Sequence, residues 1–123
     1  MNAAANALVA LIALEHVWFL VLEMFLWTKP LGLKTFRQSA EKARASAALA
    51  ANQGLYNGFL AAGLVFSLVS PQPETAFSLK VFFLACVVVA GVFGAITTAS
   101  RAILIAQALP GAAGLALVWL ARA

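Results

Sequence analysis

The sequence predicts an all-α integral membrane protein built as a four-helix bundle, and composition, hydropathy and the spacing of polar breaks support this fold class. Hydrophobic residues make up 64% and charged residues 10% of the 123 residues, whereas soluble domains carry about 25% charged residues. The mean hydropathy is +0.99. Apolar stretches recur at the length of ~20 residues that a helix needs to cross a bilayer core of ~30 Å. We therefore expect one four-helix domain over residues 1–123, multi-pass in a bacterial inner (plasma) membrane.

The first expected helix, residues 3–27, carries ionisable groups at membrane depth. Glu15 and His16 lie near its middle and Glu23 lies further on. A charged side chain there costs at least ~2.5 kcal/mol, so such groups normally face a partner helix, a cavity or a ligand. The stretch lacks a basic leader region and a small-residue cleavage site, so we expect the helix to be retained.

Polar breaks and prolines separate the remaining helices. A polar connection, residues 28–44, precedes the second helix, residues 45–69, which ends at the Ser-Pro-Gln-Pro-Glu turn of residues 70–74. The third and fourth helices, residues 76–97 and 101–120, are joined by so few residues that they should form a tight antiparallel hairpin.

The distribution of Lys and Arg predicts the orientation of the helices. Six lie on the side of the first connection and two on the other side, and the cytoplasmic side of membrane proteins carries the excess. The basic net charge is thereby explained without nucleic acid, which we do not expect as a partner. We expect a cytoplasmic first connection and both termini on the extracytoplasmic side. The six are Lys29, Lys34, Arg37, Lys42, Arg44 and Arg101, and the two are Lys80 and Arg122.

Two neighbouring helices concentrate the polar side chains. His16 and Glu23 are seven residues apart, so they fall within ~20° of one helical stripe and ~10 Å apart along the axis, while Glu15 lies ~100° away. Such groups can shuttle protons, bind a cation or hold a polar headgroup, or they can simply bond to another helix. A transition metal needs three or four ligands, and with one histidine and the single Cys86 we expect no metal site.

The second helix supplies the expected partners. Asn52 with Tyr56 and Gln53 with Asn57 are pairs four residues apart, and between them a Gly-x-x-x-Gly spacing lets helices approach closely. These groups either line a ligand site or hold two helices together. The predicted ligand-binding residues are Glu15, His16, Glu23, Asn52, Gln53, Tyr56 and Asn57.

Two runs carry a resemblance to a known family. Residues 15–27 (EHVWFLVLEMFLW) and residues 51–63 (ANQGLYNGFLAAG) resemble a bacterial family of small four-helix membrane proteins defined as a domain of unknown function, number 1304. That resemblance covers nearly the whole chain. It implies a fold and no established activity.

A fainter resemblance is to the MAPEG superfamily of membrane-associated proteins in eicosanoid and glutathione metabolism. It rests on length, the four spans, Glu41-x-x-Arg44 before an Asn-bearing helix, the Ser-Pro-x-Pro turn and Ser100-Arg101-Ala102. It implies a homo-oligomer, a trimer, that binds glutathione near the cytoplasmic surface through Arg44 and Arg101, with Asn52 and Tyr56 nearby. The chain departs from that superfamily at Leu55, where the superfamily has an acidic residue, and in a third helix without arginine.

Three functions therefore stay open. The first is a membrane protein of unknown physiological role whose polar cluster binds a small amphipathic ligand or ion. The second is a MAPEG-like enzyme that acts on a lipophilic substrate with glutathione or another thiol. The third is a structural or accessory subunit whose polar groups order the bundle.

Overall fold

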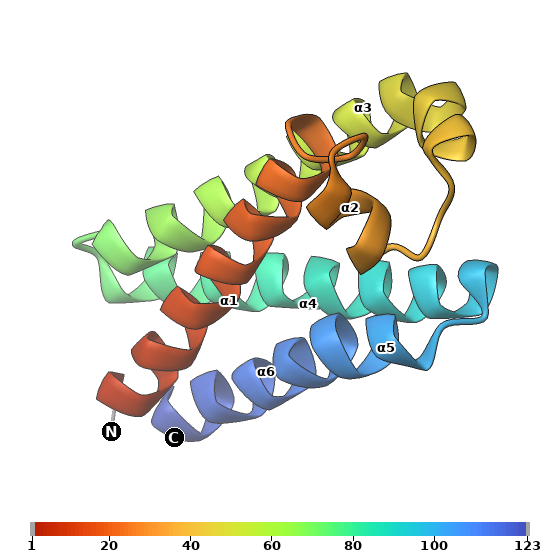
Figure 1. The fold of residues 1–123 in the computed structure, drawn as a ribbon. Helices are drawn as coiled ribbons and strands as arrows, with labels where there is room; N and C mark the ends of the chain where they lie inside the picture. The colour runs from red at the N-terminus through yellow and green to blue at the C-terminus, as the bar shows by residue number, and fades with distance from the viewer. Residues whose placement is uncertain (1, 123) are drawn as a thin grey trace. The chain divides into compact units, whose positions relative to one another are not determined.

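The computed structural model describes residues 2–122, and the predicted all-helical fold class is confirmed for these residues. Long helices dominate the described residues, with a short helix in the first connection (Figure 1). A π-helical turn lies within the last helical segment. The elements are α1 (Asn2–Met24), α2 (Pro30–Thr35), α3 (Ala40–Val69), α4 (Pro73–Thr98), α5 (Arg101–Ile103), η1 (Leu104–Ala108) and α6 (Leu109–Arg122).

The helices divide into two compact units. Residues 14–61 form one unit, which holds the second half of α1, all of α2 and the first two thirds of α3. The other unit joins the start of α1 to residues 62–122, which contain the end of α3 and all of α4 to α6. Each unit is described on its own below.

Some helices begin or end at other residues than expected, because a proline or a capping side chain fixes the first turn. The helix α1 ends at Met24 and not at residue 27, and Pro30 then begins α2 inside the predicted polar connection, residues 28–44. Proline suits a first helical turn because its missing N–H would have no partner there. The helix α3 begins five residues earlier than expected, where the Ser39 hydroxyl accepts a hydrogen bond from the Lys42 N–H at 3.1 Å.

The short connection expected between the third and fourth helices is present. Ala99 ends α4 in the left-handed backbone region, with φ of 53°. Ser100 then caps α5, because its hydroxyl accepts a hydrogen bond from the Ile103 N–H at 3.3 Å. Two residues thus reverse the chain between α4 and α5.

A π-helical turn at Leu104–Ala108 interrupts the fourth expected helix, residues 101–120. Pro110 follows this turn. Proline in a helix lacks the N–H that would bond to the carbonyl four residues earlier, and its ring collides with that carbonyl. The wider turn just before Pro110 moves the backbone away from this collision, which is how proline commonly distorts a helix.

Small residues let α4 pack closely against the last helix in the larger unit (Figure 1). A Cβ atom added to Gly91 would lie 2.6 Å from the Ala108 backbone nitrogen. Along the same contact, Gly111 faces Val87, and Gly114 faces Leu84. The side chains of Leu84 and Val87 are fully buried. The core of this unit is therefore a backbone-to-backbone contact edged by aliphatic side chains.

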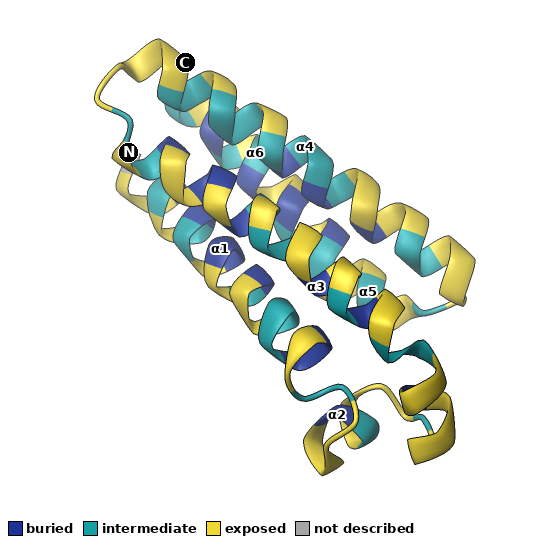
Figure 2. Cartoon of the chain, turned by 90° about the horizontal axis from the view of Figure 1, so that it is seen from above, coloured by how far each residue is buried: buried dark blue, intermediate teal, exposed yellow. Residues whose placement is uncertain are grey.

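Three helical segments are long and apolar enough to cross a membrane, namely Ala3–Met24, Pro73–Thr98 and Arg101–Arg122. The helix α3 is long enough at 30 residues, but its amides at Asn52, Gln53 and Asn57 lower its mean hydropathy. Exposed positions recur along α4 and are most frequent toward its Thr98 end (Figure 2). Several of these exposed side chains are large and apolar, including Val89, Phe93 and Ile96. Such a surface suits lipid contact better than contact with water.

The contact at Gly91 gives a first test of the fold. Gly91→Ala should lower the free energy of unfolding by about 1–3 kcal/mol, because the new methyl group overlaps the Ala108 backbone. Gly94→Ala is the matched control, since its Cβ would sit 3.4 Å from an Ile103 methyl group in ordinary contact. Thermal unfolding of the detergent-solubilised variants, followed by circular dichroism, measures both. Equal midpoints for the two variants would contradict the close contact.

Candidate functional site

Polar side chains from α1 and α3 meet in the smaller unit. The Gln53 side-chain amide donates a hydrogen bond to Glu23 Oε2 at 2.9 Å, and the Asn57 amide donates one to Glu23 Oε1 at 2.6 Å. Glu23 is 6% exposed. We call these three residues the Glu23 cluster. Both carboxyl oxygens are thus held by neutral amides from successive turns of one helix.

Two glycines bring the helices close enough for these hydrogen bonds. A Cβ atom on Gly54 would lie 2.7 Å from Met24 Cγ and 3.2 Å from Glu23 Cβ, and one on Gly58 would lie 2.7 Å from Leu20 Cδ1. Larger side chains at either glycine would push the helices apart. The predicted Gly-x-x-x-Gly spacing therefore lies at a real helix contact.

The segment that follows Glu23 is fixed by aromatic contacts. The Trp27 indole N–H donates a hydrogen bond to the Ser46 hydroxyl at 3.1 Å, and the rings of Trp27 and Phe36 lie 4.7 Å apart. These contacts connect the end of α1 to the beginning of α3. They limit the freedom of the backbone one turn away from the cluster.

The other predicted ligand-binding residues are not in the Glu23 cluster. Asn52 is exposed, and Tyr56 is 64% exposed with its ring beside Phe59. His16 is fully buried, with the Phe19 ring edge-on at 5.2 Å. Glu15 is half-buried, and its shielded Oε1 has no hydrogen-bond partner among residues 2–122. The separation of Asn52 and Tyr56 from Glu23 follows from their place one position before the Gln53 and Asn57 stripe.

The chemistry available to the Glu23 cluster is that of an oxygen-rich acceptor. Within the described part of the chain, Glu23 has no Lys or Arg partner, and no three His, Cys or acidic side chains gather as a metal site would require. Each amide donates to the carboxylate and retains a carbonyl oxygen that can accept. The arrangement can hold a proton or a cationic group and offers no nucleophile.

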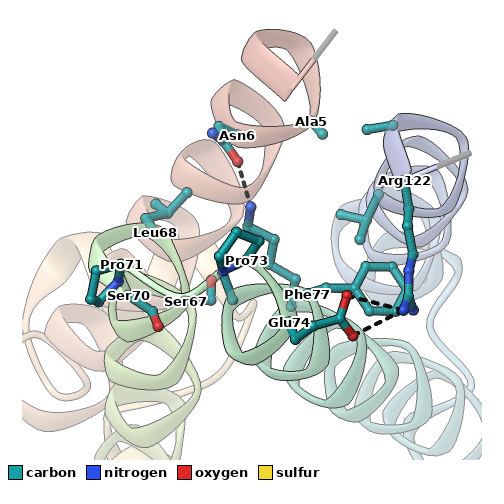
Figure 3. A pocket seen from close by; sticks show the side chains of 14 residues that line it. Ala5, Asn6, Ser67, Leu68, Ser70, Pro71, Pro73, Glu74, Phe77 and Arg122 are labelled. Atoms are coloured by element: carbon teal, nitrogen blue, oxygen red, sulfur yellow. Dashed lines mark hydrogen bonds and ion pairs between the residues drawn. The ribbon is translucent and has the colours of Figure 1, made fainter.

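The larger unit contains a cavity of about 330 Å³ that sequence reasoning missed. The start of α1, the turn between α3 and α4, and the end of α6 surround it (Figure 3). The Lys80 ammonium donates a hydrogen bond to Asn6 Oδ1 at 2.7 Å. The Arg122 guanidinium contacts Glu74 Oε2 at 3.0 Å and lies 3.9 Å from the centre of the Phe77 ring.

A signal for this cavity was present in the sequence. Lys80 is a lone cation within an apolar stretch, and it was used only to predict orientation. Glu74, Phe77 and Lys80 are spaced three apart, so they follow one side of a helix. Their partners come from the opposite ends of the chain, at Asn6 and Arg122, and no local pattern connects positions that far apart.

The two arginines expected to bind glutathione are both exposed. Arg44 lies on α3 in the smaller unit, and Arg101 is the first residue of α5 in the larger unit. Their role as cofactor ligands stays a prediction.

Comparison with known proteins supports one of the two resemblances. No curated protein and no solved structure matches the chain. The resemblance to the MAPEG superfamily finds no support. A family model described as a protein of unknown function, DUF1304, matches residues 10–119, a span that includes the Glu23 cluster and most of the residues around the cavity. The chain therefore belongs to the DUF1304 family of proteins of unknown function.

Proposed function

We propose that this protein is a small multi-pass protein of the bacterial inner membrane that binds a cationic group at the Glu23 cluster. The cationic group is either an inorganic ion or the ammonium headgroup of a small amphiphile. The observation that carries the proposal is a buried carboxylate whose two oxygens are held by two amides of the neighbouring helix.

The proposed topology has four crossings, with α3 as the crossing that hydropathy alone does not identify. At ~1.5 Å per residue, its 30 residues extend ~45 Å, which exceeds the ~30 Å of a bilayer core. The amides of Gln53 and Asn57 are bonded to Glu23, which reduces the cost of placing them in lipid. The excess of Lys and Arg beside α2 supports a cytoplasmic first connection and termini on the other side.

Electrostatics favours a cation over an anion at the Glu23 cluster. A buried carboxylate without a basic partner gains from a positive ion in a low-dielectric setting, where Coulomb interactions are strong. Carboxylate and amide oxygens are also the ligands that hard cations prefer. Two amide side chains can rotate to present their carbonyl oxygens beside the carboxylate when a cation enters.

A homo-oligomer, with three subunits favoured, stays a prediction for this protein. Native mass spectrometry of the detergent-purified chain counts the subunits and detects any retained small molecule.

The topology is tested by labelling single cysteines in a Cys86→Ser background. Gln72→Cys, in the exposed turn before α4, should react with a membrane-impermeant maleimide in intact cells. Thr35→Cys, exposed at the end of α2, should react only after the membrane is permeabilised. Labelling of Thr35→Cys in intact cells, with Gln72→Cys protected, would reverse the proposed orientation.

The Glu23 site is tested by titrating cations while the unfolding midpoint is measured at constant ionic strength. The wild-type midpoint should rise with ligand concentration, since a ligand at 100 times its Kd adds about 2.7 kcal/mol of stability. Glu23→Gln keeps the size of the side chain without its charge, and one neighbouring amide must turn its carbonyl oxygen toward the new N–H group to keep both hydrogen bonds. Its midpoint should not respond. Glu41→Gln, at an exposed carboxylate in the first turn of α3, should respond as the wild type does.

The titrations distinguish an ion from an amphiphile. A response to sodium or potassium identifies an inorganic ion site, and a response confined to hexylammonium identifies an amine headgroup. Asn57→Asp places a second carboxylate beside Glu23 and should make the midpoint depend more steeply on the cation. A wild-type midpoint that no cation raises would overturn the proposal and leave the cluster as a structural link between helices.

A further inference from the structure

The cavity in the larger unit has the composition of a site for the polar end of an amphiphile. Its lining includes the polar side chains of Lys80, Asn6 and the Glu74–Arg122 pair, and the apolar side chains of Leu68 and Val118. Figure 3 shows Asn6, Leu68, Glu74 and Arg122 around it. At about 330 Å³ it falls within the range of small-molecule sites. Polar and apolar side chains therefore line the same space.

The charges around the cavity do not cancel. Glu74 is the one acidic side chain among the described lining residues, and it is paired with Arg122. Lys80 has only the neutral Asn6 as a partner within residues 2–122. An ammonium group carries three N–H donors, and one of them is used by Asn6 Oδ1. The lining therefore has an excess of one positive charge and unused donors at Lys80.

The position of Lys80 gives the excess positive charge an energetic cost. Lys80 lies two turns into α4 and is followed by an apolar run, residues 81–96. A cation at such a position is costly in a membrane unless a partner compensates it. An anion in the cavity would supply that partner. Arg122, held by Glu74 and by the face of Phe77, lies at the same cavity as a second cation.

We propose that this cavity binds a phosphate-class anion, with Lys80 as its main contact and Asn6 and Arg122 as supporting contacts. Glu74 limits the affinity, because it competes with the anion for Arg122 and adds a negative charge. A phospholipid headgroup and free phosphate share this chemistry, and the apolar lining residues, which include Leu68 and Val118, favour the phospholipid because they can contact an acyl chain.

The test measures binding to the full chain in a neutral detergent by native mass spectrometry and by titration. The probes are dihexanoyl phosphatidylglycerol and inorganic phosphate. Lys80→Gln, which can still donate to Asn6, should weaken binding of the phospholipid about tenfold by removing a charge-assisted contact. Glu74→Gln should strengthen binding. Lys34→Gln is the control, because Lys34 is an exposed lysine on α2 and the charge change is the same.

The outcomes separate the possible ligands. Saturable phospholipid binding that inorganic phosphate does not displace supports a headgroup site, and displacement by inorganic phosphate supports a free-anion site. Equal weakening by Lys80→Gln and Lys34→Gln would overturn the proposal, because it would show general charge attraction. Unchanged binding in both Lys80→Gln and Glu74→Gln would overturn it as well. The gain expected for Glu74→Gln keeps the test decisive if Lys80→Gln folds poorly.

This inference is independent of the cation site. The cavity and the Glu23 cluster lie in different units, and they are tested with ligands of opposite charge. Loss of the cation response in Glu23→Gln would leave phospholipid binding unchanged.

Discussion

The contact between α1 and α3 at Gly54 and Gly58 is the constraint on which the candidate site depends. Without a side chain at these positions the helices approach until Met24 and Leu20 lie directly against the glycines. Only at that separation do Gln53 and Asn57 reach both oxygens of Glu23. In lipid, where apolar side chains gain little from leaving the solvent, close packing and such hydrogen bonds are what hold helices together. One geometric feature thus serves both the fold and the chemistry.

The same physical rule governs the larger unit with different residues. There Gly91 meets the backbone of the π-helical turn, and the polar contacts lie at one end of the helices, between Lys80 and Asn6 and between Glu74 and Arg122. The chain therefore carries two polar centres of opposite character, a carboxylate held by neutral amides and a lysine held by one neutral amide. Neither centre has an oppositely charged side chain as a partner within residues 2–122, and this is why we propose a cationic ligand for the first and an anionic ligand for the second.

The sequence predicts which residues share one face of a helix, because this depends only on local periodicity. Helical spacing placed Gln53 and Asn57 on one stripe and recognised the glycines between them, because positions four apart on a helix always face the same way. It grouped Asn52 and Tyr56 with them, since composition does not reveal which of two adjacent stripes faces the neighbouring helix. The contact between Asn6 and Lys80 spans 74 residues and depends on how the unit closes, which no local pattern encodes. The short helix at Pro30 was missed because it spans only six residues and contains a glycine, so it carries no helical periodicity.

The π-helical turn at Leu104–Ala108 changes which residues of the last helix face its neighbour. From the last residue of the turn onward, the buried positions are Ala108, Gly111, Gly114 and Val118, in ordinary helical steps. Continuing those steps backward through a regular helix would bring Leu104 and Arg101 to the packed side, yet both are exposed. The extra residue in the turn shifts the register by ~100°, and Ile103 and Gln107 become the half-buried positions instead. The one-residue shift in helical register therefore keeps Arg101 exposed before the turn, while Gly111 and Gly114 pack against the neighbouring helix after it.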